Sequence, residues 1–246
     1  WLSQGLAAKG AIVVAVNHPN STTGELSNLE ALNHWTRAQD LSAALDAVMQ
    51  NPALAPHIDA KRIYATGFSY GGWTALSLGG LKGRKDGLDR FCSEGGNVST
   101  HCEDILKAGI KISALDGEKW RASYKDPRIA AVAAIDPALT WGLGKSDVAG
   151  LDVPVLLIGL GDGDSRLFAT DTSAAGSNFE ALFPQAKVER IVPASHFTAL
   201  GVCKPNGAAI LKEEKDDPVC TDPAGTDRKA AMATIIKMIA AHFNLD

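Results

Sequence analysis

Long apolar runs and basic clusters are both missing from the 246-residue sequence. No apolar run approaches the roughly 18 residues of a membrane-spanning helix, so no transmembrane segment is expected. The formal net charge of −4 is mild and Lys and Arg are dispersed, which argues against a nucleic-acid-binding surface and favours a small neutral substrate. Internal repeats and low-complexity linkers are absent as well. The composition, 46% hydrophobic and 21% charged, predicts a single globular domain over residues 1–246.

Cysteine is scarce, and none of the four cysteines has the Cys-x-x-Cys spacing of a common zinc site. No metal ion is therefore expected. The cysteines fall in polar, loop-like stretches as two close pairs, Cys92 with Cys102 and Cys203 with Cys220. Two local disulfides are predicted, which places the protein in an oxidising compartment, either secreted or periplasmic.

Short apolar runs alternate with helical patterns along the chain. The runs are apolar at nearly every position, which is typical of strands that are buried on both faces of a parallel sheet. The sequence therefore predicts a doubly wound, mostly parallel α/β sheet. The expected strands are residues 11–16, 62–67, 129–135, 153–160 and 187–193, and the clearest helices lie near 35–49, from 71 onward and near 227–243.

Residues 81–127 interrupt this alternation. The segment is rich in Gly and charged residues, contains the first cysteine pair, and carries a short helical stretch with the sequence CEDILKAG. An excursion between a helix and a strand of such a sheet lies above the carboxyl ends of the strands, where ligands bind. We expect an insertion over the site; a surface insertion remote from the site is the alternative.

The hexapeptide GFSYGG, residues 67–72, has the spacing Gly-x-Ser-x-Gly and stands between an apolar run and a run of small residues. A strand, a sharp turn and a following helix make a nucleophile elbow, in which the serine takes a strained backbone conformation. The motif alone occurs by chance in many proteins, but this context predicts that Ser69 is a nucleophile. The backbone N–H of Tyr70, the next residue, is then expected to stabilise an oxyanion.

A serine hydroxyl needs a neighbouring base, and the base needs an acid that orients it. His196 soon follows the last expected strand, whereas the other histidines lie before Ser69, in the insertion or on the final helix, so His196 is the candidate base. Three carboxylates stand at the carboxyl ends of strands on the serine's side of the sheet. They are Asp136, Asp162 and Asp164, and their positions alone leave the choice of acid open.

Several stretches together resemble the α/β-hydrolases of the platelet-activating-factor acetylhydrolase and predicted dienelactone hydrolase group. They are GFSYGG, DPRIAAVAAIDPALTWG, VPVLLIG and ASHFTALGVC with the later VCTDPAGTDR, and the resemblance covers nearly the whole chain in the order Ser, Asp, His. It implies an α/β-hydrolase fold, hydrolysis of carboxylic esters and no cofactor. The acetylhydrolase branch places the acid where Asp136 stands, whereas the dienelactone hydrolase branch places it near Asp164 and Asp162.

These residues lead us to expect a serine esterase that acts on a small-molecule or lipid-like ester through an acyl-enzyme. Two alternatives stay open: an amidase or peptidase with the same triad, and a non-catalytic binding protein of the same fold. Large aromatic residues beside the elbow either line an apolar cleft or pack the sheet. The candidates for substrate contact are Phe68, Trp73, Trp141 and Phe197.

The nucleophile comes early in the chain. Only one expected strand, residues 11–16, precedes Ser69, and no His-Gly segment of the kind that supplies a second oxyanion donor occurs upstream of it. The opening residues WLSQGLAAKG resemble the helix that follows such a segment in the hydrolase group. We therefore expect residues 1–246 to be the carboxyl-terminal part of a longer polypeptide, whose amino-terminal fragment is a candidate partner.

Overall fold

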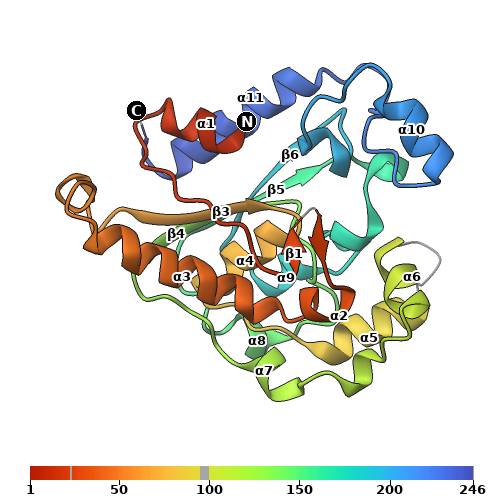
Figure 1. Ribbon diagram of the computed structural model, residues 1–246, viewed down its shortest axis with the longest axis horizontal. Coiled ribbons are helices and arrows are strands. Elements are labelled where there is room, and N and C mark those ends of the chain that lie inside the picture. The colour runs from red at the N-terminus through yellow and green to blue at the C-terminus, as the bar shows by residue number, and fades with distance from the viewer. Residues whose placement is uncertain (23, 95–99, 246) are drawn as a thin grey trace.

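The computed structural model describes residues 1–22, 24–94 and 100–245. Helices cover both faces of one parallel sheet, so the protein has a mixed α/β fold, as the sequence predicts at this level (Figure 1). The strands follow one another in space as they do in the chain, in the order β3-β4-β5-β6. They are β3 (Ile63–Phe68), β4 (Ile129–Ile135), β5 (Val155–Leu160) and β6 (Lys187–Ile191).

The two central strands are the most deeply buried part of the sheet. Every residue of β5 is buried, and so is every residue of β4 except the half-buried Ala130. Successive side chains of a strand point to opposite faces, so a strand covered on both faces is apolar throughout, as IAAVAAI and VLLIGL are. Proline shifts two of the expected strand ends: β5 begins after Pro154 and β6 ends before Pro193, because proline has no N–H for the sheet ladder.

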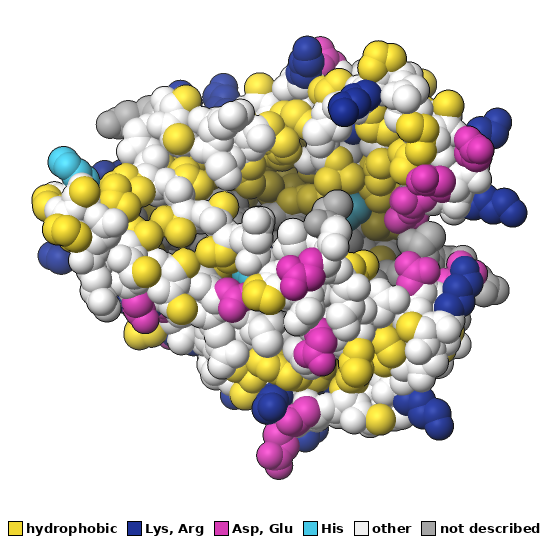
Figure 2. Space-filling view, in the orientation of Figure 1, with side chains coloured by type: hydrophobic (Ala, Val, Ile, Leu, Met, Phe, Trp, Pro, Cys, Tyr) yellow, Lys and Arg dark blue, Asp and Glu magenta, His cyan; other side chains and the backbone are white. Residues whose placement is uncertain are grey.

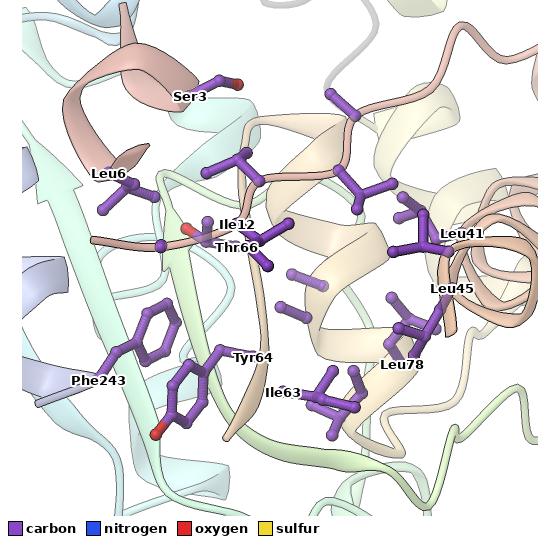
Figure 3. Close-up of a pocket in the computed structure, with 18 of the residues that line it drawn as sticks. Ser3, Leu6, Ile12, Leu41, Leu45, Ile63, Tyr64, Thr66, Leu78 and Phe243 are labelled. Carbon is purple, nitrogen blue, oxygen red and sulfur yellow. The ribbon is translucent and has the colours of Figure 1, made fainter. Parts of the chain in front are cut away.

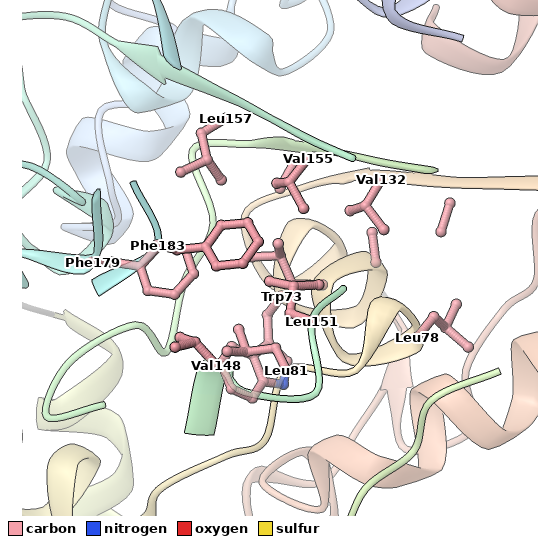
Figure 4. Close-up of a cluster of buried hydrophobic side chains, with 14 of the residues drawn as sticks. Trp73, Leu78, Leu81, Val132, Val148, Leu151, Val155, Leu157, Phe179 and Phe183 are labelled. Atoms are coloured by element: carbon pink, nitrogen blue, oxygen red, sulfur yellow. The ribbon is translucent and has the colours of Figure 1, made fainter. Parts of the chain in front are cut away.

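Two helical layers enclose the sheet. One layer packs on a cluster of buried apolar side chains that includes Trp73, Leu157 and Phe179 (Figure 4). The other layer packs on a separate cluster that includes Ile158 and Ile239. The strands β3, β4 and β5 therefore send alternate side chains into two different apolar layers. The helices are α3 (His34–Gln50) and α4 (Tyr70–Gly79) on the first face, and α1 (Leu2–Ala7) and α11 (Arg228–His242) on the second.

Residues 11–16, expected to form a strand, have no regular secondary structure and are not part of the sheet. The segment runs beside β3 (Figure 1), but Ile12, Val13 and Val14 are 46%, 37% and 37% exposed. The prediction of a strand here is wrong because strand formation requires hydrogen bonds to a neighbouring backbone. No described strand pairs with the segment to supply them.

The insertion, residues 81–127, folds as short helices around a third apolar cluster, in which Phe91 and Trp120 are buried together with Leu32 and Trp35 from outside the insertion. Cys92 and Cys102 form a disulfide within this cluster, which confirms the first predicted pair. Residues 95–99 of the expected insertion lie outside the described residues. The elements are α5 (Lys85–Glu94), α6 (Thr100–Lys107), η3 (Ile112–Ala114) and α7 (Gly117–Arg121).

The remaining elements are short connections between the main ones. Two of them, β1 and β2, pair as an antiparallel hairpin. Among the described residues, no helix has both the length and the apolar character needed to cross a membrane. The bounds are β1 (Ser21–Thr22), β2 (Glu25–Leu26), α2 (Asn28–Ala31), η1 (Ala55–His57), α8 (Lys145–Val148), η4 (Gly163–Ser165), η5 (Phe168–Thr170), α9 (Phe179–Leu182), η6 (His196–Ala199) and α10 (Gly207–Glu214).

Candidate active site

Ser69 stands in the turn between β3 and α4 with backbone angles φ 54° and ψ −117°. A positive φ is strained for a serine, and such strain is typical of a nucleophile elbow. The turn is also tight, because a Cβ on Gly67 would lie only 2.4 Å from the backbone of Gly71. Glycine is therefore required at position 67 by the close approach of the strand end to the helix start, whereas a Cβ on Gly71 would meet nothing within 4 Å.

His196 begins η6, shortly after the end of β6, and its imidazole is nearly buried, with 6% of the residue exposed. Its Nε2 lies 3.1 Å from Ser69 Oγ, within hydrogen-bonding distance. Two aromatic rings pack against the imidazole: the Phe68 centroid is 4.5 Å away and the Phe197 centroid 5.6 Å away. The ring is thus held in an orientation that points one nitrogen at the serine hydroxyl.

Asp136 directly follows β4 and is fully buried. Its Oδ2 lies 2.7 Å from His196 Nδ1, and its Oδ1 accepts a hydrogen bond of 3.0 Å from the N–H of Leu160 in β5. A buried carboxylate is stable only when such partners satisfy it. A continuous hydrogen-bonded path therefore runs from the Asp136 carboxylate through the imidazole to the Ser69 hydroxyl. This arrangement can draw the proton from the serine and stabilise the imidazolium that results.

Two residues that the sequence patterns did not suggest complete the surroundings of Asp136. The Thr170 hydroxyl donates a hydrogen bond of 2.8 Å to Asp136 Oδ2. Arg166 is buried, with Nη2 3.6 Å from Asp136 Oδ1 and Nε 2.6 Å from Asp171 Oδ1. One guanidinium thus serves two carboxylates. Both residues lie in the irregular stretch after β5, which carries no recognisable motif.

Arg166 also shifts the acidity of its second partner. Burial by itself raises the pKa of Asp171, but hydrogen bonds from Arg166 and Ser173 outweigh burial, so the pKa lies below its usual range. Asp171 is therefore held as a carboxylate, which keeps the Arg166 guanidinium in place. The same guanidinium then fixes one oxygen of Asp136 from behind. We regard Arg166 as a positioning residue, because it does not reach the serine side of the site.

The two alternative acids lie elsewhere. Asp162 and Asp164 are both exposed, at the start of and within η4. The N–H of Asp162 donates to the hydroxyl of Ser165, a local contact of the turn. Within the described chain, the carboxylate that contacts the His196 imidazole is that of Asp136, and no contact joins it to Asp162 or Asp164. Of the three candidates, only Asp136 is placed to orient the imidazole.

The loop that carries His196 is tied to the following segment. Cys203 and Cys220 form a disulfide, which confirms the second predicted pair. Beyond it, Asp222 accepts hydrogen bonds of 2.7 Å from the Thr198 hydroxyl and 2.8 Å from Nε of Arg228, the first residue of α11. The short helix of His196 is thereby anchored to the start of α11, one side of which is buried against the sheet, and this restricts movement of the imidazole.

The four aromatic candidates separate into different environments. Phe68 and Phe197 touch His196, whereas Trp73 has no exposed surface and packs in the core beneath α4 instead of lining a cleft. Trp141 is half-buried, and its ring lies 4.5 Å from that of Phe168, which belongs to the loop after β5. Figure 2 shows a hollow on the viewed face in which apolar side chains and a histidine are visible.

Tyr70 contributes its backbone to the site and its side chain to the fold. Its hydroxyl donates a hydrogen bond of 2.6 Å to the carbonyl oxygen of Ala31, away from Ser69. Its N–H is in the first turn of α4, where amides have no partner within the helix. None of the hydrogen bonds in the described part of the chain uses this N–H. It is free to donate to an oxygen that approaches Ser69.

Comparisons with known protein families and curated sequences do not identify a family for this chain. The chain matches no protein-family model, and a search of curated protein sequences gives no match either. The hydrogen-bonded path from Asp136 through His196 to Ser69 and the strained elbow therefore carry the functional interpretation, together with the resemblance of the quoted motifs.

Proposed function

We propose that the protein is a serine hydrolase that cleaves carboxylic esters. The observation that carries the proposal is the pair of contacts at His196, 3.1 Å from Nε2 to Ser69 Oγ and 2.7 Å from Nδ1 to the fully buried carboxylate of Asp136. A nucleophile, a base and an orienting acid within hydrogen-bonding reach are what acyl transfer requires. The resemblance to the acetylhydrolase and dienelactone hydrolase group supports the same reaction class and an α/β-hydrolase fold.

The contacts define a role for each group in the first half of the reaction. Asp136 accepts the Nδ1–H of His196, which leaves Nε2 free to take the proton of Ser69 as Oγ attacks the ester carbonyl. The carbonyl oxygen becomes an oxyanion, to which the N–H of Tyr70 donates. The imidazolium then returns its proton to the leaving alcohol, and an acyl-enzyme remains on Ser69. In the second half, water loses a proton to Nε2 as its oxygen attacks the acyl carbonyl carbon. The bond from that carbon to Ser69 Oγ then breaks, the imidazolium returns the proton to Oγ, and the carboxylic acid is released.

The surroundings of the triad favour an apolar substrate. Phe68 and Phe197 flank the imidazole, and Trp141 and Phe168 form an aromatic surface from the loops after β4 and β5. Such rings bind apolar acyl or alcohol groups without requiring charge. We propose a small-molecule or lipid-like ester. The two disulfides favour an oxidising compartment, and we propose that the protein is secreted or periplasmic.

Active-site labelling with a fluorophosphonate tests the proposal. The parent protein should form one covalent adduct at Ser69, and Ser69→Ala should remove both the adduct and ester hydrolysis, with a loss of about 10³-fold or more. Ser77→Ala is a matched control, because Ser77 lies in α4 with a buried hydroxyl that has no partner among the described residues. That variant should label normally.

The outcomes separate the alternatives. An unlabelled parent that still binds apolar esters would identify a non-catalytic binding protein. A labelled parent that cleaves an anilide as fast as the matched phenyl ester would identify an amidase, because the ester has the better leaving group and should react faster in an esterase. An adduct on a serine other than Ser69 would overturn the assignment of the nucleophile.

A further inference from the structure

A cavity of about 450 Å³ lies between β3 and the segment 10–16, and Ser69 is not among the residues that line it. Residues 10–16 line one side of it and residues 62–66 line the other. Figure 3 shows Ile12 of this segment and Ile63, Tyr64 and Thr66 of β3 among the residues that line the cavity. The cavity thus separates β3 from a segment whose sequence, AIVVAV, is typical of a strand.

The edge of β3 that faces away from β4 has unused hydrogen-bonding groups. Ser69 N–H donates to Ile135 O of β4, and the groups of successive strand residues point to opposite edges. The N–H and C=O groups of Tyr64, Thr66 and Phe68 therefore point away from β4. Since β3 is the first strand of the sheet order, no described strand pairs with them.

The segment on the opposite side of the cavity also has unpaired backbone N–H and C=O groups. Ala11 donates its N–H to the carbonyl oxygen of Leu6, but residues 12–17 take part in no backbone hydrogen bond within the described chain. Two rows of unpaired peptide groups thus line one cavity. Unpaired peptide groups are costly when buried and are the usual template for pairing with another strand.

Apolar side chains lie above and below the plane of the sheet in this cavity, although polar residues such as Ser3, Arg37 and Ser42 also line it. On one face it is closed by Leu41 and Leu45 of α3 and Leu78 of α4, and on the other by Leu6 of α1 and Phe243 (Figure 3). These are the same two layers into which β4 and β5 send alternate side chains. A chain placed in the cavity would therefore bury apolar side chains on both faces.

We propose that this cavity binds an extended peptide strand with successive apolar, β-branched residues, which adds to the sheet between β3 and residues 11–16. Only an extended backbone can satisfy peptide groups along both walls while sending side chains into both layers. An acyl chain would fill the apolar space and leave those groups unpaired, and a helix uses its own peptide groups internally. The site is distinct from the triad, and the proposal does not depend on catalysis.

Hydrogen exchange measured residue by residue tests the proposal, with a short valine- and isoleucine-rich peptide flanked by paired lysines as the probe. On binding, the exchange rates of the amides of Tyr64, Thr66 and Phe68 should fall by a factor of about ten or more. Those of Ala65 and Gly67, which already face β4, should not change. This alternation distinguishes a paired strand from a ligand that merely shields the cavity.

Matched controls sharpen the test. The same peptide with a central proline should lose the effect, because proline cannot donate to the ladder. The double variant Val13→Pro/Val14→Pro removes N–H groups from the exposed wall and should weaken binding, whereas Val202→Pro, at another exposed valine in an irregular stretch, should not.

Several results would overturn the proposal. No change at saturating peptide, or equal slowing at all β3 amides, would exclude strand pairing. Equal slowing by dodecanoate would assign the cavity to an acyl chain. Protection of Val188 and Arg190 instead would move the peptide to the outer edge of β6. Protection that rises with protein concentration alone would assign the edge to a second copy of the chain.

Discussion

Two apolar runs of the same length have opposite structures in this protein. Residues 155–160, VLLIGL, form β5, which is buried at every position between β4 and β6. Residues 11–16, AIVVAV, contain more β-branched residues, yet they form no strand and expose Ile12, Val13 and Val14. Intrinsic preference for the strand conformation therefore does not separate the two runs.

The difference lies in what surrounds each run. β5 has a strand on either side, so its peptide groups are paired and both helical layers close over its side chains. Residues 11–16 face a cavity where a neighbouring strand would be. A strand is thus a property of the pair, because a hydrogen-bonded neighbour both satisfies the backbone and holds the chain in register for burial. The paired side of β3 also carries the candidate catalytic groups.

The largest expected effect is on kcat and concerns Asp136, which lies on the side of β3 that pairs with β4. Asp136→Asn should lower kcat for ester hydrolysis by about 10⁴-fold, because an amide favours the wrong imidazole tautomer. Asp164→Asn is the matched control and should change kcat far less, since Asp164 is exposed and does not contact His196 in the described structure. Steady-state kinetics on one ester substrate measure both. The opposite ranking would transfer the role to the loop after β5, and small equal effects would exclude both residues.

The next comparison sets the two runs against each other directly. Leu156→Ala in β5 removes a fully buried side chain and should lower the free energy of unfolding by about 2–5 kcal/mol. Val14→Ala in the exposed run should change it by about 0.5 kcal/mol or less. Urea unfolding measures both changes, provided that the dependence of the unfolding free energy on urea concentration (the m-value) is the same in the variants and the parent. A large cost at Val14 would show that residues 11–16 are packed in solution, and saturating strand peptide should raise that cost if the cavity is filled as proposed.

The sequence predicted the paired part of the fold well. β4 has the expected bounds, 129–135, because an unbroken apolar run is stable only where helical layers cover both of its faces, as they do in the middle of a parallel sheet. Both disulfides also match the expected pairs, since each joins cysteines close in sequence. Residues 11–16 could not be assigned in the same way. Their local pattern is that of a strand, and what they lack is a neighbour, which no local pattern reveals.

The candidate site was predictable in part for a related reason. Ser69 belongs to a motif with a local physical cause, the tight turn, and His196 follows a strand. The choice among three aspartates depends on a distance across the sheet, which position in the chain does not give. Arg166 and Thr170 come from an irregular stretch whose course depends on the carboxylates that it surrounds. The expectation of an amino-terminal fragment stays a prediction.

The smallest expected effect concerns two buried histidines. His34, the first residue of α3, is fully buried among Trp73 and Trp120, and burial lowers its pKa to about 4 despite a contact with the Trp120 carbonyl. His18, beside the cavity, is nearly buried; burial lowers its pKa too, and a hydrogen bond to Asp40 opposes the change.

Because the pKa of His34 is lower in the folded than in the unfolded protein, the unfolded state binds more protons below about pH 6.5, and stability falls as the pH drops toward 4. The expected loss between pH 7 and pH 5 is about 2 kcal/mol from His34 alone. Urea unfolding at several pH values should show this slope in the parent and in His57→Asn, an exposed control, and a shallower slope in His34→Phe. If filling the cavity with strand peptide buries His18 further, the slope should steepen in the parent and in His34→Phe alike; an unchanged slope would mean that the peptide does not reach His18.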